Sequence, residues 1–323
     1  MQAGMVRFGY FLACETFGPR ELVRQAKMAE QAGFERLWIS DHFHPWLPEQ
    51  GQSPFVWSVI GALSEVTSLP ITTAVTCPTF RTHPAVIAHA AATAGAQCDG
   101  GFVLGVGSGE ALNEHITGDR WPPADLRLSM MEEAVEVIRR LHGGERVTHR
   151  GQHYTVENAR LYTLPEQPVP IYISGFGPRA ARRAGRVGDG FCTMMPDAQL
   201  VNAFRDNGGG DKPVQAGLKV CWADTEQEGA RTAHRLWRSE LLPGTLPQQL
   251  PNPEDFEPAT SLVTEDMARE NFPCGCDPQR VLDRIEQFDD AGVDELYLQQ
   301  IGPEQEKFFQ AWSEVLAPRV GAR

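Results

Sequence analysis

The sequence predicts an α/β protein folded as a (β/α)8 TIM barrel with insertions. About eight short apolar segments alternate with helix-like segments over the 323 residues, which is the rhythm of that fold. Several of the apolar segments are followed directly by a cluster of polar residues. A barrel of parallel strands holds its catalytic groups at this position, the C-terminal ends of the strands. A doubly wound sheet is the competing fold, but no Gly-x-Gly-x-x-Gly follows the first apolar segment.

The first half of the chain supplies four pairs of strand and helix. Residues 6–13 alternate and are rich in apolar and aromatic side chains, whereas residues 19–32 place apolar side chains at helical spacing. Gly33 suits the end of that helix. Further strands are expected at 37–39, 71–76 and 102–106, and further helices at 54–67, 84–94 and 127–141.

The second half continues the alternation with two interruptions. Residues 147–162 have the pattern of a strand pair hanging off the barrel, and residues 241–272 are proline-rich and irregular at first, with some helix. We therefore expect one domain, residues 1–323, with insertions near 145–165 and 241–275. Further strands are expected at 171–174, 190–193, 218–223 and 295–300, and further helices at 178–187 and 278–291.

Composition and charge exclude several classes of partner. Lys plus Arg total 29 against 42 Asp plus Glu, and the net charge of −13 is not interrupted by a basic block. A nucleic-acid or anionic-membrane partner is therefore not expected. No apolar run approaches the length of a membrane span, and no signal-peptide pattern opens the chain. The seven cysteines are scattered, which favours reduced thiols and a soluble, cytoplasmic protein.

The stretch after the second predicted strand carries the first candidate site. An apolar run beginning at Leu37 stops at Asp41, His42, His44 and Trp46. A carboxylate, two imidazoles and an indole together supply a titratable base, an orienting acid and a flat stacking surface. A purely structural interpretation explains the local pattern equally well, with Asp41 capping a helix and Trp46 packing in the core.

Three motifs at successive strand ends extend this site. They are Asp41-His42-Phe43-x-Pro45-Trp46, Pro78-Thr79-Phe80-Arg81 with His83-Pro84-Ala85-Val86-Ile87-Ala88, and Gly105-Val106-Gly107-x-Gly109-Glu110-Ala111-Leu112-Asn113-Glu114. Together they closely resemble the luciferase-like, deazaflavin-dependent oxidoreductases. The nearest pattern is the group of glucose-6-phosphate dehydrogenases that use coenzyme F420. The resemblance continues through Ala184-Gly185-Arg186-x-Gly188-Asp189-Gly190-Phe191 and Leu316-Ala317-Pro318-Arg319, so it spans nearly the whole chain and implies a barrel of the bacterial luciferase-like type.

The resemblance implies three catalytic roles that the chemistry of alcohol oxidation permits. His42 matches the base of the family, and a histidine with a near-neutral pKa suits removal of a hydroxyl proton. Glu110 matches the carboxylic acid that delivers a proton to the reduced deazaflavin ring. Trp46 matches the indole held over the reacting centre, where it excludes water. The structural alternative for Glu110 is that it only caps a helix.

The resemblance also implies which residues contact coenzyme F420. The Ala74–Val75 bond falls where the family has a cis non-proline peptide bond against the cofactor. Residues 174–179 open a helix whose free N–H groups can bind the phosphodiester of the cofactor tail. The contact positions implied in this way are Asp41, Ala74, Val75, Cys77, Ser108, Gly109, Asn113, Ser174, Gly175, Phe176 and Gly177.

The substrate wall departs from the sugar-phosphate enzymes. Those enzymes continue Phe-x-Cys-Thr with Ser-Gly-Lys, and the lysine grips the substrate phosphate. Here Thr193 is followed by Met194, Met195 and a proline, and a phosphate dianion without charged partners is poorly held. Thr193, Met194 and Met195 are expected to line the substrate site. The substrate is expected to be other than glucose 6-phosphate, unless Arg269 or Lys307 restores the missing charge.

The leading hypothesis is a coenzyme F420-dependent dehydrogenase that takes hydride from an alcohol or sugar carbon. The alternatives are a sugar-6-phosphate dehydrogenase with a rearranged phosphate site, and a flavin-dependent monooxygenase on the same barrel. A third class is a binding protein for deazaflavin or metal, in which Asp41, His42 and His44 are ligands. No metal is expected, because no further ligand stands in register. A small-molecule substrate and a homodimer complete the expectations.

Overall fold

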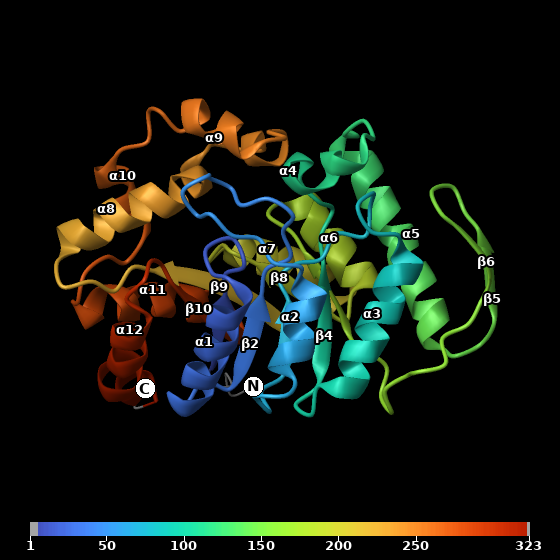
Figure 1. Cartoon of the computed structure of the whole chain (residues 1–323), viewed down its shortest axis with the longest axis horizontal. Helices are drawn as coiled ribbons and strands as arrows, with labels where there is room; N and C mark the ends of the chain where they lie inside the picture. The colour runs from blue at the N-terminus through green and yellow to red at the C-terminus, as the bar shows by residue number, and fades with distance from the viewer. Residues whose placement is uncertain (1–5, 322–323) are drawn as a thin grey trace.

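The computed structural model describes residues 6–321, in which eight parallel strands close into a barrel (Figure 1). Neighbouring strands follow the order β1-β10-β9-β8-β7-β4-β3-β2, and β2 pairs with β1 to close the ring. The predicted TIM barrel is confirmed. The barrel strands are β1 (Arg7–Leu12), β2 (Arg36–Ile39), β3 (Ile71–Thr73), β4 (Phe102–Val106), β7 (Ile171–Ser174), β8 (Gly190–Thr193), β9 (Val214–Val220) and β10 (Glu295–Gln300).

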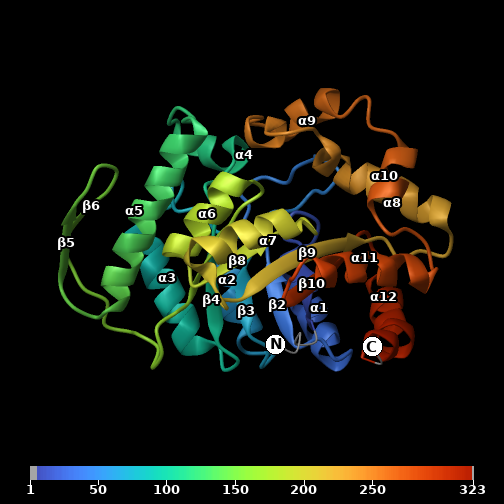
Figure 2. The ribbon, with the colours of Figure 1, turned by 180° about the vertical axis from the view of Figure 1, so that it is seen from behind.

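Helices cover the outside of the barrel (Figures 1 and 2). In the first of them Leu22, Ala26 and Ala29 are buried, a spacing that places all three on one helix face. No helix within residues 6–321 combines the length and apolar character needed to cross a membrane. The covering helices are α1 (Pro19–Gln31), α2 (Val56–Leu63), α3 (Pro84–Gln97), α5 (Ala124–His142), α6 (Pro178–Val187), α7 (Ala198–Phe204), α11 (Pro278–Asp290) and α12 (Gln305–Ala311).

Two strands differ from their predicted bounds by more than one residue at an end. β3 ends at Thr73, and the chain leaves the ladder at the Ala74–Val75 peptide bond, which is cis. β9 begins at Val214 and ends at Val220, earlier than the predicted 218–223. The polar side chains of Gln215 and Lys219 hid this strand, because a strand with polar groups facing a barrel interior lacks a continuous apolar pattern.

Several helices were not predicted, among them α7, α12 and α8 (Glu226–Trp237). The start of α8 carries a sequence signal, since Thr225 precedes Glu228 by three residues. The Thr225 hydroxyl accepts from the Glu228 backbone N–H at 3.2 Å, as expected of a helix cap. The ends of some predicted helices differ from the observed ends. The helix predicted at 54–67, for example, is α2, which covers only Val56–Leu63.

Side chains close the end of the barrel where the strands begin. Trp38 stacks on Tyr297 with ring centroids 4.5 Å apart, and its indole N–H donates to Gln215 Oε1 at 2.8 Å. Gln215 donates in turn to Glu295 at 2.7 Å, and Arg36 pairs with the same carboxylate at 2.8 Å. These side chains form the floor of the barrel. Functional groups therefore have room only at the other end, where the strands finish.

Two segments lie outside the regular alternation. The hairpin of β5 (Val147–Arg150) and β6 (Thr155–Ala159) stands beside α5 at the edge of the molecule (Figure 2). The segment that follows α8 contains α9 (Pro253–Ala259) and α10 (Glu265–Asn271) and lies over the ends of the barrel strands (Figure 1). It therefore borders the loop that follows β2.

Candidate active site

His42 lies at the centre of the candidate site, in the loop after β2. Its Nδ1 is 3.1 Å from the carbonyl oxygen of His44, and its Nε2 is 3.4 Å from Glu15 Oε1 and 3.9 Å from Glu110 Oε2. Only 11% of the side chain is accessible. When Nδ1 carries the ring proton and donates to the His44 carbonyl, Nε2 is free to accept a proton. The carboxyl group of Glu15 then stabilises the imidazolium that forms.

Asn113 fixes the positions of His42 and Glu110 relative to each other. Its Oδ1 accepts from the backbone N–H groups of Phe43 at 2.8 Å and His44 at 3.2 Å. The amide nitrogen must therefore face the other way, where it lies 3.1 Å from His42 Nδ1 and 3.2 Å from Glu110 Oε2. Asn113 thus holds the backbone of the His42 loop and the Glu110 carboxyl group in one unit. Its direct contact with a cofactor stays a prediction.

Glu15 belongs to this site, although the sequence prediction missed it. The residue is 3% exposed, and its Oε2 accepts from the Ser40 hydroxyl at 2.6 Å while Oε1 faces His42. The signal that could have found it is its position. Glu15 follows the end of β1 as His42 follows β2 and Glu110 follows β4, and these ends meet at one face of the barrel.

Glu110 does not act as a helix cap. It occupies the N-cap position of α4 (Ala111–Glu114), but its side chain makes no capping hydrogen bond, so the capping interpretation is wrong. Burial raises the pKa of the Glu110 carboxyl group, and the nearby Glu15 and Glu114 raise it further. The interaction with His42 lowers this pKa, but by less than burial raises it. Because 28% of the side chain remains accessible, Glu110 can hold a proton and still be reached.

Trp46 forms a wall beside the base. Its ring centroid lies 5.1 Å from that of His42, and its other side meets Phe256 of α9 edge to face at 5.5 Å. Gln50 fixes this loop, since its Oε1 accepts from the Trp46 backbone N–H at 2.8 Å and its Nε2 donates to the Leu236 carbonyl at 2.9 Å. The indole is therefore held between the base and the segment that covers the strand ends.

Asp41 and His44 are engaged by the protein. The carboxylate of Asp41 accepts from the Thr76 hydroxyl at 2.8 Å and from Arg81 at 2.8 Å, one bond to each oxygen. His44 turns its Nδ1 to a backbone carbonyl at 2.9 Å. Asp41, His42 and His44 therefore do not converge on one point, and residues 6–321 contain no group of three such side chains placed to hold a metal ion.

The cis peptide bond that the resemblance implied is present between Ala74 and Val75. Both side chains pack against a cluster inside the barrel that includes Phe11 and Trp38. A Cβ atom added to Gly107 would lie 2.7 Å from Val75, so glycine is needed there for this wall to form. The wall follows the end of β3, on the face of the barrel where the functional groups gather.

Cys77, Ser108 and Gly109 lie next to this wall. Cys77 is buried, and its sulfur is 3.0 Å from the Thr79 hydroxyl. Burial raises the pKa of the Cys77 thiol well above its usual range, which keeps the thiol neutral. Gly109 has φ of +83°, a conformation that favours glycine, and it leads into Glu110.

The loop from Ser174 to Gly177 joins β7 to α6. Gly177 is the N-cap residue of α6 and makes no side-chain capping bond, so the first N–H groups of this helix are available to an anion. Gly175 donates its N–H to the Cys192 carbonyl at 3.0 Å. Phe176 is 50% exposed. Cofactor contacts of these residues stay predictions.

Thr193, Met194 and Met195 lie at the end of β8, as expected. Thr193 is buried, and its hydroxyl accepts from the Met195 N–H at 3.3 Å. Met194 packs against the barrel cluster that contains Phe11 and Trp38, whereas Met195 is 42% exposed. The segment after β8 is therefore apolar, at the place where the resemblance implies a lysine in the sugar-phosphate enzymes.

The two cations considered as replacements are already paired elsewhere. Arg269 contacts Asp266 at 2.8 Å, and Lys307 contacts Asp224 and Glu304 at 3.1 Å each. Their side chains are 44% and 49% accessible. Both charges are thus compensated at the surface, and neither supports a restored phosphate site.

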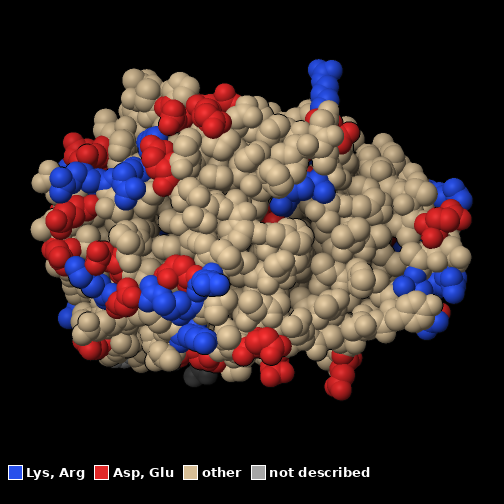
Figure 3. Space-filling model, in the orientation of Figure 1, with Lys and Arg blue, Asp and Glu red and all other residues tan. Residues whose placement is uncertain are grey.

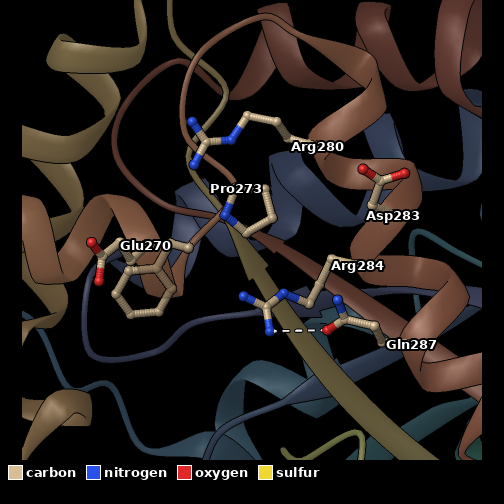
Figure 4. Close-up of a pocket in the computed structure, with 7 residues that line it drawn as sticks. Glu270, Pro273, Arg280, Asp283, Arg284 and Gln287 are labelled. Atoms are coloured by element: carbon tan, nitrogen blue, oxygen red, sulfur yellow. Dashed lines mark hydrogen bonds between the residues drawn. The ribbon is translucent and has the colours of Figure 1, made fainter.

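A recess of about 170 Å³ between α10 and α11 contains two more arginines (Figure 4). Arg284 donates to the Asn271 carbonyl at 2.9 Å and to Gln287 at 3.2 Å. Arg280 donates to the Arg269 carbonyl at 2.7 Å. These bonds tie α11 to the end of α10, and none of the candidate catalytic residues lines the recess. The recess is a helix contact and not the active site.

One cation does lie in the barrel mouth, and the sequence prediction missed it. Lys219 of β9 has a side chain only 7% accessible, and its Nζ donates to Glu240 Oε1 at 2.8 Å. The ammonium group also lies 4.4 Å from the centroid of the Trp237 ring. The signal that could have identified it is a lysine in a strand all of whose residues are buried, but β9 was not recognised at these bounds.

Comparison with known proteins assigns this geometry to a family. The luciferase-like monooxygenase family model matches residues 5–295. The chain belongs to this family. It is 36% identical to the F420-dependent glucose-6-phosphate dehydrogenase of Rhodococcus erythropolis, with 98% of each chain covered. It is also 36% identical to the enzyme of that name from Nocardia farcinica, with 99% of each chain covered.

Solved structures agree. An F420-dependent secondary alcohol dehydrogenase in complex with an F420-acetone adduct superimposes with a TM-score of 0.90 at 30% identity, covering 98% of this chain and 99% of that one. The coenzyme F420-dependent tetrahydromethanopterin reductase of Methanopyrus kandleri gives 0.78 at 22% identity and shows the fold alone. The resemblance seen in the motifs is confirmed. An F420-dependent dehydrogenase acting on a CH–OH group is confirmed at the level of these relatives.

Proposed function

We propose that this family member is a coenzyme F420-dependent dehydrogenase that oxidises a neutral alcohol or sugar and does not select glucose 6-phosphate. The observation that carries the proposal is the placement of His42 Nε2 beside Glu15 and Glu110. Asn113 holds the loop of the base and the carboxyl group of the acid in that arrangement. Alcohol oxidation with this cofactor needs one group that accepts a proton and another that donates one.

The protein groups supply both proton transfers. Oxidising an alcohol removes the hydroxyl proton and a hydride from the same carbon, and bound coenzyme F420 accepts the hydride and one proton. His42 Nε2 takes the hydroxyl proton, and the carboxyl group of Glu15 stabilises the resulting charge. Glu110 supplies the other proton, because its raised pKa keeps the carboxyl protonated at higher pH. Trp46 keeps water from the base.

The residues present fit the cofactor. The N-terminus of α6 lacks a side-chain cap and so offers N–H groups to the phosphodiester of the cofactor tail. Ala74 and Val75 form an apolar wall above the barrel core, which suits one face of a flat ring. The first feature follows β7 and the second follows β3, and only β4 lies between these two strands in the barrel.

A neutral substrate is supported by the apolar wall of Met194 and Met195. Arg269 and Lys307 are paired with carboxylates. The structural relative at 30% identity is in complex with an F420-acetone adduct, and acetone carries no phosphate. A charge-assisted contact to a charged group is worth about 1.5–3 kcal/mol, so one lost lysine weakens phosphate binding by roughly 10–100-fold.

Reduction of coenzyme F420 under anaerobic conditions tests the proposal. Purified protein is given the oxidised cofactor with glucose, glucose 6-phosphate or secondary alcohols, and the loss of deazaflavin absorbance is followed. We expect reduction with a neutral substrate, and a KM for glucose 6-phosphate well above that for the best neutral one. A micromolar KM for the phosphorylated sugar would overturn the substrate proposal. FMN binding equal to or tighter than F420 binding would overturn the cofactor and favour a flavin monooxygenase.

We further propose that the protein is cytoplasmic and a homodimer. All seven cysteines are unpaired thiols, which supports a reducing compartment. Phe55 and Val86, at the starts of α2 and α3, are 61% and 58% exposed, and the middle of the face in Figure 3 carries few charged side chains. Light scattering is expected to give twice the 35.7 kDa mass of one chain. A monomer mass at micromolar concentration would contradict the dimer.

A further inference from the structure

The barrel mouth contains polar side chains that the proton transfers at His42 do not use. On β9 and β10 the pairs Gln215–Glu295 and Lys219–Gln299 stand in register. Gln215 and Glu295 hydrogen-bond to each other at 2.7 Å in the barrel floor. Because alternate residues of a strand face the same side, Lys219 and Gln299 face the same interior, closer to the mouth.

The surroundings of Lys219 place its ammonium group beside both parts of the active site. Nζ lies 5.8 Å from the centroid of the Phe11 ring and 4.4 Å from that of Trp237. Phe11 belongs to the cluster that carries the cis peptide residues of the proposed cofactor wall. Trp237 belongs to the cluster against which Trp46 packs. A molecule that reaches from the cofactor wall to the Trp46 indole therefore passes close to Lys219.

The mouth has hydrogen-bonding capacity that the protein leaves unused. Among residues 6–321, Lys219 Nζ has Glu240 as its one hydrogen-bond acceptor, although an ammonium group carries three donors. Gln299 is 1% exposed, and its Oε1 is buried without a donor. An unpaired buried carbonyl oxygen is costly. A hydroxyl group can accept from the ammonium and donate to an amide oxygen, so it matches this arrangement.

The charge of the cluster selects among ligands. Glu240 lies 2.8 Å from the Lys219 ammonium and 30% of its side chain is accessible. The pair is neutral overall, so a phosphate would have to displace a carboxylate that is already in place. A neutral hydroxyl group needs no such exchange, and it can use the open donors of Lys219 and the free side of Glu240.

We propose that Lys219, Glu240 and Gln299 bind a hydroxyl group of the substrate other than the one oxidised at His42. The cluster thereby selects neutral polyols and sugars over simple alcohols. This inference rests on the proposed function, since it names the substrate class of the same site. It assigns Lys219 to substrate binding and not to proton transfer, so its removal acts on KM and leaves kcat nearly unchanged.

Steady-state kinetics on size-matched substrates test the proposal. Wild type, Lys219→Met and the control Lys307→Met are compared on cyclohexanol, inositol and glucose with saturating F420. Lys307 also pairs with carboxylates, but it is exposed. We expect Lys219→Met to lower kcat/KM on the two polyols by roughly 10–100-fold through KM. Cyclohexanol kinetics, F420 affinity and all kinetics of the control should stay within about twofold of wild type.

Other outcomes overturn the proposal. An equal loss on cyclohexanol and on the polyols would show that Lys219 supports the fold or the chemistry. A larger loss on glucose 6-phosphate than on glucose would make Lys219 an anion site. If Lys219→Met does not fold, Glu240→Gln replaces it. Glu240 is partly exposed, and its variant should show the same selective rise in KM for the polyols.

A binding measurement separates this inference from the proposed function. If none of the alcohols or sugars supports F420 reduction by the wild type, the dehydrogenase proposal fails. Polyol binding can still be measured by thermal shift of the F420-loaded protein. We expect inositol or glucose to raise Tm in wild type and in Lys307→Met, and not in Lys219→Met. The absence of any shift in wild type would overturn the hydroxyl site itself.

Discussion

His42 is the residue whose replacement separates chemistry from binding. Its Nε2 faces two carboxyl groups, and the role proposed for it is proton transfer, not contact with the cofactor. We predict that His42→Ala lowers kcat by roughly 10²–10⁴-fold, the usual contribution of a positioned base. F420 affinity should change little, as fluorescence titration can show. The control is His89→Ala at an exposed position of α3, and an unchanged kcat in His42→Ala would remove His42 from the mechanism.

Glu110 makes a prediction about pH. Because burial raises the pKa of its carboxyl group, the protonated form persists above the ordinary range and is lost as the pH rises through the shifted value. The rate of F420 reduction should fall over that interval in wild type. In Glu110→Gln the rate should be lower at every pH, and this basic limb should be missing. A basic limb that survives the substitution assigns it to another group.

The same shift predicts an effect on stability. A raised native-state pKa means that the folded protein binds this proton more tightly than the unfolded chain does. The stabilisation is complete below about pH 4, the ordinary range of glutamate, and it is lost as the pH rises through the native-state value. Thermal melts of wild type and Glu110→Gln should therefore diverge in favour of the variant as the pH increases. A constant difference in Tm would contradict the shift.

Single residues also show what a sequence can and cannot reveal about a site. His42, Glu110 and Asn113 come together as their motifs predicted, because each follows a strand whose end reaches the same face. Glu15 and Lys219 were missed for different reasons. Glu15 carries no motif beyond its place after β1. Lys219 shows its role only through Glu240, a contact between residues 21 positions apart in the chain.

At the scale of elements, the loop after β2 depends on a single glutamine. Gln50 is 4% exposed, accepts from the N–H groups of Trp46 and Leu47, and donates to the carbonyl of Leu236 at the end of α8. Gln50→Ala leaves these buried groups unpaired, at about 1–3 kcal/mol for each. We predict a lower Tm and a kcat reduced by roughly 10–100-fold as Trp46 shifts. Gln52→Ala, exposed in the same loop, should change neither.

Element boundaries explain most of the errors in the predicted fold. α5 was clear from sequence because its buried face runs through Met131, Val135 and Ile138 at helical spacing. β9 was misplaced because Gln215 and Lys219 interrupt its apolar pattern, and both polar groups find partners only across the barrel. α8 was missed although Thr225 caps it. Periodicity reports burial against neighbours, and it fails where the buried side chains are polar.

At the scale of the whole molecule, the alternation of strand and helix was enough to predict the barrel, because eight parallel strands with covering helices have few other ways to close. The segment over the strand ends was predictable only as irregular. Its contact with the active site arises through Trp46 and Phe256, residues that no local pattern connects. Sequence pattern alone therefore reaches the reaction class before it reaches the substrate.

The sealed floor of the barrel has a consequence for the order of events in turnover. Trp38, Tyr297, Gln215 and Glu295 block passage through the barrel, so both reactants enter and both products leave by one doorway. In the proposed reaction hydride passes directly from the substrate carbon to the cofactor, so both molecules must be inside together. Initial-velocity lines should therefore intersect when both concentrations are varied, whereas parallel lines would indicate that one reactant departs before the other arrives.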